Sequence, residues 1–182
     1  MGEGDFHIDI LRQGWLGDEP NAAAVDLCSH GRMRIVIGGQ VVTDGSEDYG
    51  VSETALALLR TLERDHSRGQ PVAERLVFHG CGTMLMMGCP IGIDWSVQHL
   101  PGERVRISEV RRFDTTNDAK AVTFPELTVD LHESEYRRAV TRFATEAKRL
   151  FAGVSKSIED KWDRQQYDQF WQEYDGLLER FG

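Results

Sequence analysis

Two short patterns pair a cysteine with a histidine two residues away: Cys28 with His30, and His79 with Cys81. Residues two apart on a β-strand project from the same face, so each pattern predicts a thiol beside an imidazole if it lies on a strand. Two such strands side by side would supply a Cys₂His₂ ligand set, which suits zinc. The sequence therefore offers a zinc site, with Cys89 as a spare fifth ligand.

The same residue types support two other interpretations. Zinc ligands usually occur in close pairs such as Cys-x-x-Cys, and this chain has no such pair, which favours buried, reduced cysteines beside hydrogen-bonded histidines. The other interpretation is a cysteine nucleophile activated by a neighbouring base. Its nucleophile would be Cys81 or Cys89, its base His79 or His99, and Asp94 would orient the imidazole.

The stretch 79–95 contains two of the three cysteines and four glycines. Glycines in and around a strand usually mark bulges or close approach of another backbone. We therefore expect this stretch to be a tightly packed, buried strand or turn, and a functional pocket is the alternative.

The charge of the chain restricts its partners. It has 182 residues, a formal net charge of −9 and a pI near 5.1. Proteins that bind nucleic acid by neutralising phosphates need a basic face, so the composition argues against nucleic acid. A basic protein partner remains compatible with this charge.

Three cysteines, an odd number, predict reduced thiols rather than a disulfide framework. The first residues have neither the basic nor the apolar segment of a secretory signal, and no run approaches the roughly 20 apolar residues of a membrane helix. We therefore expect a cytoplasmic protein with no membrane association.

Apolar periodicity predicts strands first and helices last. Period-two patterns and turn residues predict strands at 6–10, 23–29, 32–37, 41–42, 75–78, 93–100, 105–113 and 122–131. Gly38-Gly39 predicts a two-residue hairpin turn of the primed type, and Pro125 predicts an interruption of the last strand. Residues 44–50 read as an acidic loop.

Three helices are predicted from apolar residues at three- and four-residue spacing. The first has Ser52 as its N-cap and ends near His66. The second is capped by Ser134 and ends at Gly153, and the third has a capping box that begins at Asp163.

These elements predict a single α+β domain over residues 1–182. Its mainly antiparallel sheet has about six or seven strands, covered by the central helix and by a C-terminal helical pair at 134–181. The last helix carries an aromatic stripe, and Trp171 and Tyr174 are predicted to anchor an interface if part of that stripe is exposed. Homo-oligomerisation stays open.

The chain has no nucleophile elbow, phosphate loop or zinc-protease signature. A small acidic domain without a catalytic motif is predicted to be a non-enzymatic protein that binds a basic partner, and immunity-type inhibitors of basic toxins are one class with this profile. The alternative is a small metal-dependent or cysteine-dependent enzyme built on the cysteines and histidines at 28–30 and 79–89.

Overall fold

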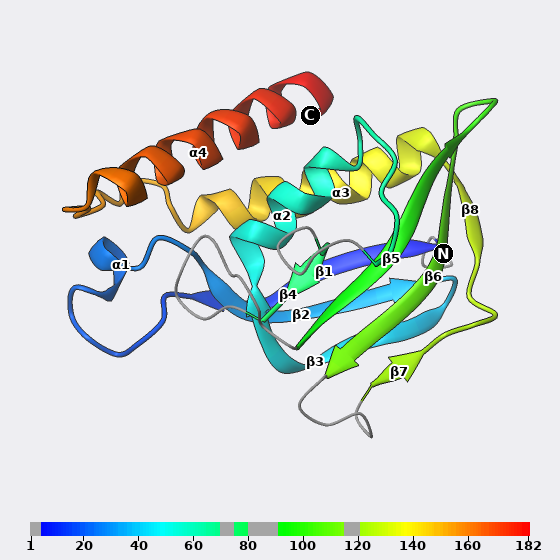
Figure 1. Ribbon diagram of the computed structural model, residues 1–182, viewed down its shortest axis with the longest axis horizontal. Coiled ribbons are helices and arrows are strands. Elements are labelled where there is room, and N and C mark those ends of the chain that lie inside the picture. The colour runs from blue at the N-terminus through cyan, green and yellow to red at the C-terminus, as the bar shows by residue number, and fades with distance from the viewer. Residues whose placement is uncertain (1–4, 70–74, 80–90, 115–120) are drawn as a thin grey trace.

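Antiparallel strands and three long helices make up the part of the chain that the computed structural model describes, which is residues 5–69, 75–79, 91–114 and 121–182. The long helices lie together on one side of the strands (Figure 1). The strands are β1 (Phe6–Gly14), β2 (His30–Ile37), β3 (Gln40–Gly50), β4 (Val77–Phe78), β5 (Ile91–Leu100), β6 (Arg104–Asp114), β7 (Val122–Thr123) and β8 (Val129–His132). The helices are α1 (Ala22–Val25), α2 (Val51–Arg60), α3 (Glu133–Arg149) and α4 (Lys161–Phe181).

The first sheet is an antiparallel meander in the order β1-β2-β3. Gly38 and Gly39 connect β2 to β3 with φ angles of 56° and 75°, and a type I′ turn requires positive φ at both positions. The predicted primed hairpin is therefore confirmed. The core-facing residues of the first sheet include Phe6 and Ile8 of β1 and Met33, Ile35 and Ile37 of β2.

The second sheet has the order β4-β5-β6-β7, and β8 pairs with β6 as well. A three-residue turn joins β5 to β6, with positive φ at Gly102 and at Glu103. Pro125 lies between β7 and β8, so the predicted interruption of the last strand is confirmed. Proline lacks the N–H group that a continuous strand would need there.

Aromatic contacts join both sheets to the helices. Phe6 of β1 packs against Trp95 of β5 at a ring-centroid distance of 6.1 Å and against Tyr136 of α3 at 5.1 Å. All three side chains are buried. One hydrophobic core therefore includes residues of both sheets and of the long helices.

The two C-terminal helices pack on each other and on α2. The buried stripe of α3 is Tyr136, Val140, Phe143, Ala144 and Ala147. The α4 helix buries Tyr174 and Leu177, and the Tyr174 hydroxyl donates a hydrogen bond of 2.7 Å to the Ala144 carbonyl. Figure 1 shows α4 as the outermost helix.

The predicted strand at 23–29 is wrong. Residues 22–25 form α1, and β2 begins only at His30. The carboxylate of Asp26 explains the difference, because it accepts the backbone N–H groups of Leu16 and Cys28 and so replaces the partners of a β-ladder. Sequence periodicity does not report such side-chain to backbone bonds.

The predicted acidic loop at 44–50 is also wrong, because this segment is the second half of β3. Asp48 stands opposite Arg32 in the ladder, and its carboxylate lies 3.2 Å from Arg12 and 3.8 Å from Arg32. Cross-strand pairs of opposite charge are compatible with a strand, and they compensate for the low strand propensity of aspartate.

The helix boundaries differ from the predicted ones by a few residues. The α2 helix ends at Arg60 rather than near His66, because His66 pairs its backbone with Val97 of β5. Asp160, not Asp163, caps α4 by accepting the N–H groups of Trp162 and Asp163. At α3 the cap is His132, whose ring accepts from Ser134, rather than Ser134 itself.

The predicted fold class is confirmed: the chain is α+β, with antiparallel strands, one central helix and two C-terminal helices. The strands divide into two sheets rather than one. Among the described residues, no helix is both long enough and apolar enough to cross a membrane.

Candidate functional site

A buried group of polar side chains surrounds the first predicted ligand pair. Cys28 precedes β2, so the two-residue spacing on a strand does not apply to it. Asp26 organises the pair instead: one carboxylate oxygen accepts the N–H of Cys28 at 3.1 Å, and the other lies 3.1 Å from Nε2 of His30. Cys28 is 0% exposed and His30 is 8% exposed.

Glu53 from the first turn of α2 completes this group. Its carboxylate accepts a hydrogen bond from the Ser52 hydroxyl at 2.8 Å and lies near the Cys28 thiol. Among the described residues, neither the buried Glu53 Oε1 atom nor the buried Nδ1 of His30 has a hydrogen-bond partner. Burial raises the pKa of Glu53, and the hydrogen bonds from Cys28 and Ser52 only partly oppose this.

Burial also raises the pKa of the Cys28 thiol, and the nearby charges of Glu53 and Asp26 raise it further. A nucleophilic cysteine needs the opposite: a lowered pKa and access to solvent. Cys28 is therefore a buried thiol beside Glu53, without the properties of a nucleophile. The buried cluster of Asp26, Cys28, His30 and Glu53 connects the start of β2 to the start of α2.

Lys156 covers one side of the buried cluster. Its ammonium group donates to the carbonyls of Ala23 at 2.7 Å and Asp26 at 2.5 Å, and lies 3.5 Å from the centroid of the Trp15 ring. Burial lowers the pKa of Lys156 to about 8. Trp15 in turn packs edge-on against Phe151 at 4.8 Å.

The second predicted ligand pair lies partly outside the described residues, since Cys81 and Cys89 fall in 80–90. His79 follows β4, and its backbone N–H donates to Ile91 at 3.2 Å. Across the described ranges, no three His, Cys, Asp or Glu side chains are arranged to hold a metal ion. The zinc site with Cys28, His30, His79 and Cys81 stays a prediction.

Asp94 orients an imidazole, but not one that the sequence patterns indicated. Its carboxylate lies 2.8 Å from Nε2 of His66 and also accepts the N–H groups of Gly69 and Leu76. His99 instead pairs with Asp65 at 2.9 Å. The partnership of Asp94 with His66 depends on the fold of the chain after α2, and no local sequence signal reports it.

The predicted interface residues lie on the inner side of α4. Tyr174 is 0% exposed, and Trp171 packs against Phe151 with ring centroids 4.5 Å apart. Tyr174 is thus a core residue in this structure, and only the interface role of Trp171 is compatible with its half-buried position. The exposed aromatic residue of α4 is Trp162, at 55% exposure, which sequence reasoning missed.

Trp162 lies in the first turn of α4, near segments that carry two other exposed apolar side chains. Leu16 is 53% exposed and Val25 is 51% exposed. Hydrogen bonds join their segments: Leu16 N–H donates to Asp26, next to Val25, and the N–H of Ser157, just before α4, donates to Ala24 of α1. Figure 1 shows α1 beneath the first turns of α4.

Exposed carboxylates accompany these apolar side chains. Asp18 and Glu19 lie in the loop before α1, and Glu159 and Asp160 directly precede α4. Asp18, Glu19 and Glu159 make no ion pair with any residue that the structure describes. We name Leu16, Val25 and Trp162, with Asp18, Glu19, Glu159 and Asp160, the α1 surface.

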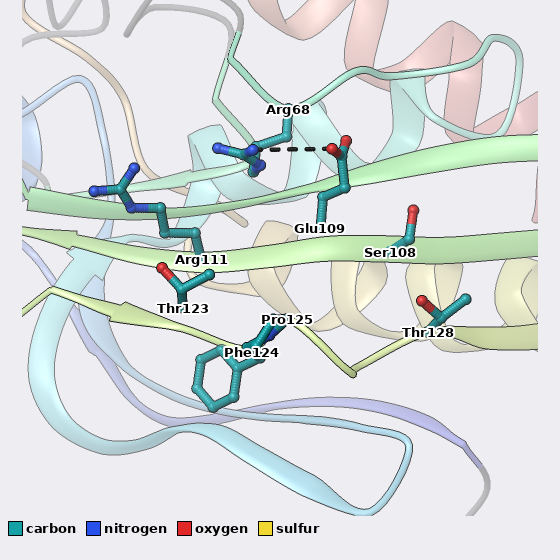
Figure 2. Close-up of a pocket in the computed structure, with 8 residues that line it drawn as sticks. All are labelled: Arg68, Ser108, Glu109, Arg111, Thr123, Phe124, Pro125 and Thr128. Atoms are coloured by element: carbon teal, nitrogen blue, oxygen red, sulfur yellow. Dashed lines mark ion pairs between the residues drawn. The ribbon is translucent and has the colours of Figure 1, made fainter.

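A separate pocket of about 310 Å³ lies on the outer face of the second sheet (Figure 2). Its polar lining consists of Arg68, Ser108, Glu109, Arg111, Thr123 and Thr128. Phe124 and Pro125 form its apolar wall. In Figure 2, Arg68, Glu109 and Arg111 stand on the same side of β6.

A bulge in β6 shapes this pocket. The register between β5 and β6 shifts between Asp94 and Ser96, and Glu109 has a φ of 56°, which is unusual for a residue with a side chain. The extra residue leaves Ser108 and Glu109 both facing outward, while Ile107 and Val110 remain in the core. The bulge therefore brings Ser108, Glu109 and Arg111 to one face.

Glu109 connects the bulge to the loop after α2. The Ser96 hydroxyl donates to Glu109 at 2.6 Å and accepts the Arg68 N–H at 2.9 Å. The Arg68 guanidinium lies 3.9 Å from the Glu109 carboxylate, at the outer limit of an ion pair (Figure 2). Ser96 thus fixes both the Arg68 backbone and the Glu109 side chain.

Comparison of the chain with protein-family models, with curated proteins and with solved structures finds no significant match.

Proposed function

We propose that this chain is a non-enzymatic binding domain that holds a basic protein partner against the α1 surface. One observation supports this proposal. Three of the five large apolar side chains that are exposed in the described residues lie on segments that are joined by hydrogen bonds: Leu16, Val25 and Trp162. These segments also carry exposed carboxylates that make no ion pair with a described residue. Single exposed apolar residues are ordinary on a protein surface, but a group of them marks an interaction site.

The residue types of the α1 surface fit a protein interface. Tryptophan is among the side chains that contribute most to binding energy, and Trp162 is more than half exposed. Carboxylates at the edge of an interface steer a positively charged partner and exclude a negatively charged one. The net charge of −9 also attracts a positively charged partner at longer range.

The finer assignment, an immunity-type inhibitor of a basic toxin in the cytoplasm, is part of the proposal. Its support is the acidic charge, the acidic rim of the α1 surface and the reduced thiol of Cys28. The enzyme alternative rests on Cys81 and Cys89, which lie outside the described residues, and the described cysteine, Cys28, is a buried thiol with a raised pKa.

Site-specific photo-crosslinking tests the proposal. A benzophenone amino acid replaces Val25, at 51% exposure, and in a matched control it replaces Leu11 of β1, at 54% exposure. We expect the Val25 probe, in cells that produce the chain, to crosslink one basic protein that the Leu11 probe does not reach. The same products from both positions, or an acidic partner, would contradict the proposal.

The crosslinked protein is then purified and its affinity measured by calorimetry. We expect Trp162→Ala to raise Kd by about tenfold or more and Leu11→Ala to leave it unchanged. We also expect Asp18→Lys with Glu19→Lys to slow association mostly at low salt. An unchanged Kd for Trp162→Ala would overturn the proposal, and sedimentation of the chain alone would reveal a second copy as the partner.

A further inference from the structure

We propose that the pocket on the outer face of β6 binds a small organic phosphate, with Arg68 and Arg111 as the cationic groups. This inference is independent of the α1 surface, which consists of other segments of the chain. It rests on the lack of a described hydrogen-bond or ion-pair partner for Arg111, on the set of donors around the pocket and on the left-handed backbone of Glu109.

Arg111 has no carboxylate paired with it among the described residues. It makes no hydrogen bond or ion pair with any described residue, and its buried Nε atom has no acceptor. Its guanidinium instead lies 4.8 Å from the centroid of Phe113. A buried donor without an acceptor is costly, so an acceptor from a ligand would satisfy a group that the described part of the chain leaves unpaired.

The carboxylate best placed to neutralise Arg111 is already occupied. Asp94 stands directly opposite Arg111 in the β5–β6 ladder. Its oxygens accept His66, Gly69 and Leu76 instead. The segment after α2 thus occupies the carboxylate that stands opposite Arg111, and no other described carboxylate pairs with the guanidinium.

A second arginine over Phe113 increases the positive potential. The Arg75 guanidinium lies 4.3 Å from the centroid of the same ring, and its buried Nη1 also has no hydrogen-bond partner among the described residues. Both guanidinium groups lie near the same ring, so both add positive charge to this region of the sheet. Arg75 does not line the pocket, so we assign it a supporting role only.

The pocket has more hydrogen-bond donors than the two oxygens of a carboxylate ligand would need. Two guanidinium groups and the hydroxyls of Ser108, Thr123 and Thr128 line the same space. A phosphate has three terminal oxygens and can accept from all these groups, and arginine is well suited to it. Phe124 and Pro125 supply a surface for the organic part, and the volume of about 310 Å³ is at the lower end for small-molecule sites.

Glu109 competes with the ligand for Arg68. Its side chain is 56% exposed, so the 3.9 Å pair with Arg68 is weak and is readily replaced. The left-handed backbone at Glu109 is a strain that proteins retain mostly at functional positions. We assign Glu109 the role of holding Arg68 near the pocket until the phosphate replaces the carboxylate.

Titration of the ¹⁵N-labelled full chain with phenyl phosphate at constant ionic strength tests this site. We expect a saturable shift of the Arg111 Nε–H signal. Arg68→Gln and Arg111→Gln should each raise Kd by about tenfold or more, and Glu109→Gln should lower it. Arg104→Gln, which removes the same charge from the other end of β6, should change Kd by less than about twofold.

Three results would overturn the inference. The first is the absence of saturation at about 20 mM phenyl phosphate, which corresponds to an affinity too weak for a site. The second is an equal loss of affinity in Arg104→Gln, which would indicate general charge attraction. The third is benzoate binding as tightly as phenyl phosphate, which would refute the phosphate assignment. Trp162→Ala should leave this titration unchanged, so its outcome is separate from that of the α1 surface.

Discussion

Ser29 and Ser52 exchange hydrogen bonds across the junction of β2 and α2. The N–H of Ser29 donates to the Ser52 hydroxyl at 2.9 Å, and the N–H of Ser52 donates to the Ser29 hydroxyl at 3.1 Å. The Val51 N–H, at the start of α2, donates to the Ser29 carbonyl at 2.7 Å. These bonds satisfy N–H groups that a helix N-terminus leaves free.

We therefore predict that Ser52→Ala destabilises the chain by about 1–3 kcal/mol. The substitution leaves the buried N–H of Ser29 without an acceptor and removes the hydroxyl that donates to Glu53. Urea denaturation followed by circular dichroism measures the change. Ser155→Ala, on an exposed loop, should stay within about 0.5 kcal/mol of the parent, and a similar loss in both variants would contradict this account.

The Asp26–His30 pair predicts a defined pH dependence of stability. Burial alone would raise the pKa of Asp26, but hydrogen bonds from His30 and from the N–H groups of Leu16 and Cys28 lower it below 3.8. Burial alone would lower the pKa of His30, but the hydrogen bond and charge of Asp26, with the charge of Glu53, raise it above 6.5. Both pKa shifts make the free energy of unfolding depend on pH, because each group binds protons differently in the folded and unfolded states.

The stabilisation from Asp26 is complete above pH 3.8, the pKa of an unperturbed aspartate, and is lost as the pH falls through the lower pKa of the folded state. The stabilisation from His30 is complete below pH 6.5, the pKa of an unperturbed histidine, and is lost as the pH rises through the higher pKa of the folded state. A double-mutant cycle of Asp26→Asn and His30→Gln should therefore show its largest coupling between about pH 4 and pH 6.5. A coupling that is constant up to about pH 9 would refute this prediction.

Glu53→Gln should make the chain relatively more stable as pH rises from 4 to 7. Burial raises the folded pKa of Glu53 above 4.5, so the folded state holds a proton that the unfolded state has released, and the parent loses stability over this interval. Glutamine has no charge to bury. Thermal melts of both proteins across this range measure the difference, with exposed Glu159→Gln as the control. A difference independent of pH would contradict the raised pKa.

The elements of this fold could be predicted where a pattern is local. The Gly38-Gly39 turn and the apolar stripe of α3 are such patterns, and both are present. The second half of β3 could not be predicted, because its strand character depends on Arg12 and Arg32, which lie far away in the sequence and reach Asp48. Long-range ion pairs leave no periodic signal.

The candidate sites were less predictable for the same reason. Residue spacing indicated Cys28 and His30 as candidates. Asp26, which pairs with His30, and Glu53, which lies beside Cys28, belong to no sequence motif. The pocket of Arg68 and Arg111 depends on a bulge at Glu109, and an ordinary glutamate gives no sign of a positive φ. Neither site could be derived from residue spacing alone.

Gly31 in β2 is predicted to tolerate no side chain. A Cβ atom there would lie 1.8 Å from the carbonyl oxygen of Arg12, which belongs to the paired strand and cannot retreat without breaking the ladder. We expect Gly31→Ala to destabilise the chain by about 3 kcal/mol, measured by urea denaturation. Gly14→Ala is the matched control at the end of β1, because a Cβ there meets no atom within 4 Å. Equal stability of the two variants would refute the clash.

The strain at Glu109 predicts that glycine is more stable than alanine at this position, the reverse of the usual order in a strand. At an ordinary strand position alanine is more stable than glycine by about 0.5–1 kcal/mol. A positive φ of 56° costs a residue with a side chain about 1–2 kcal/mol, so Glu109→Gly should be more stable than Glu109→Ala by about 1 kcal/mol. Both variants lack the carboxylate, so their difference isolates the backbone.

Urea denaturation of this pair is compared with Gln98→Gly and Gln98→Ala on β5, where φ is not positive and alanine should be the more stable. Both Glu109 variants should also bind phenyl phosphate more tightly than the parent, since each frees Arg68. If Glu109→Ala is the more stable of its pair, the backbone at Glu109 is not strained. The bulge would then position Ser108 and Arg111 without storing energy at the pocket.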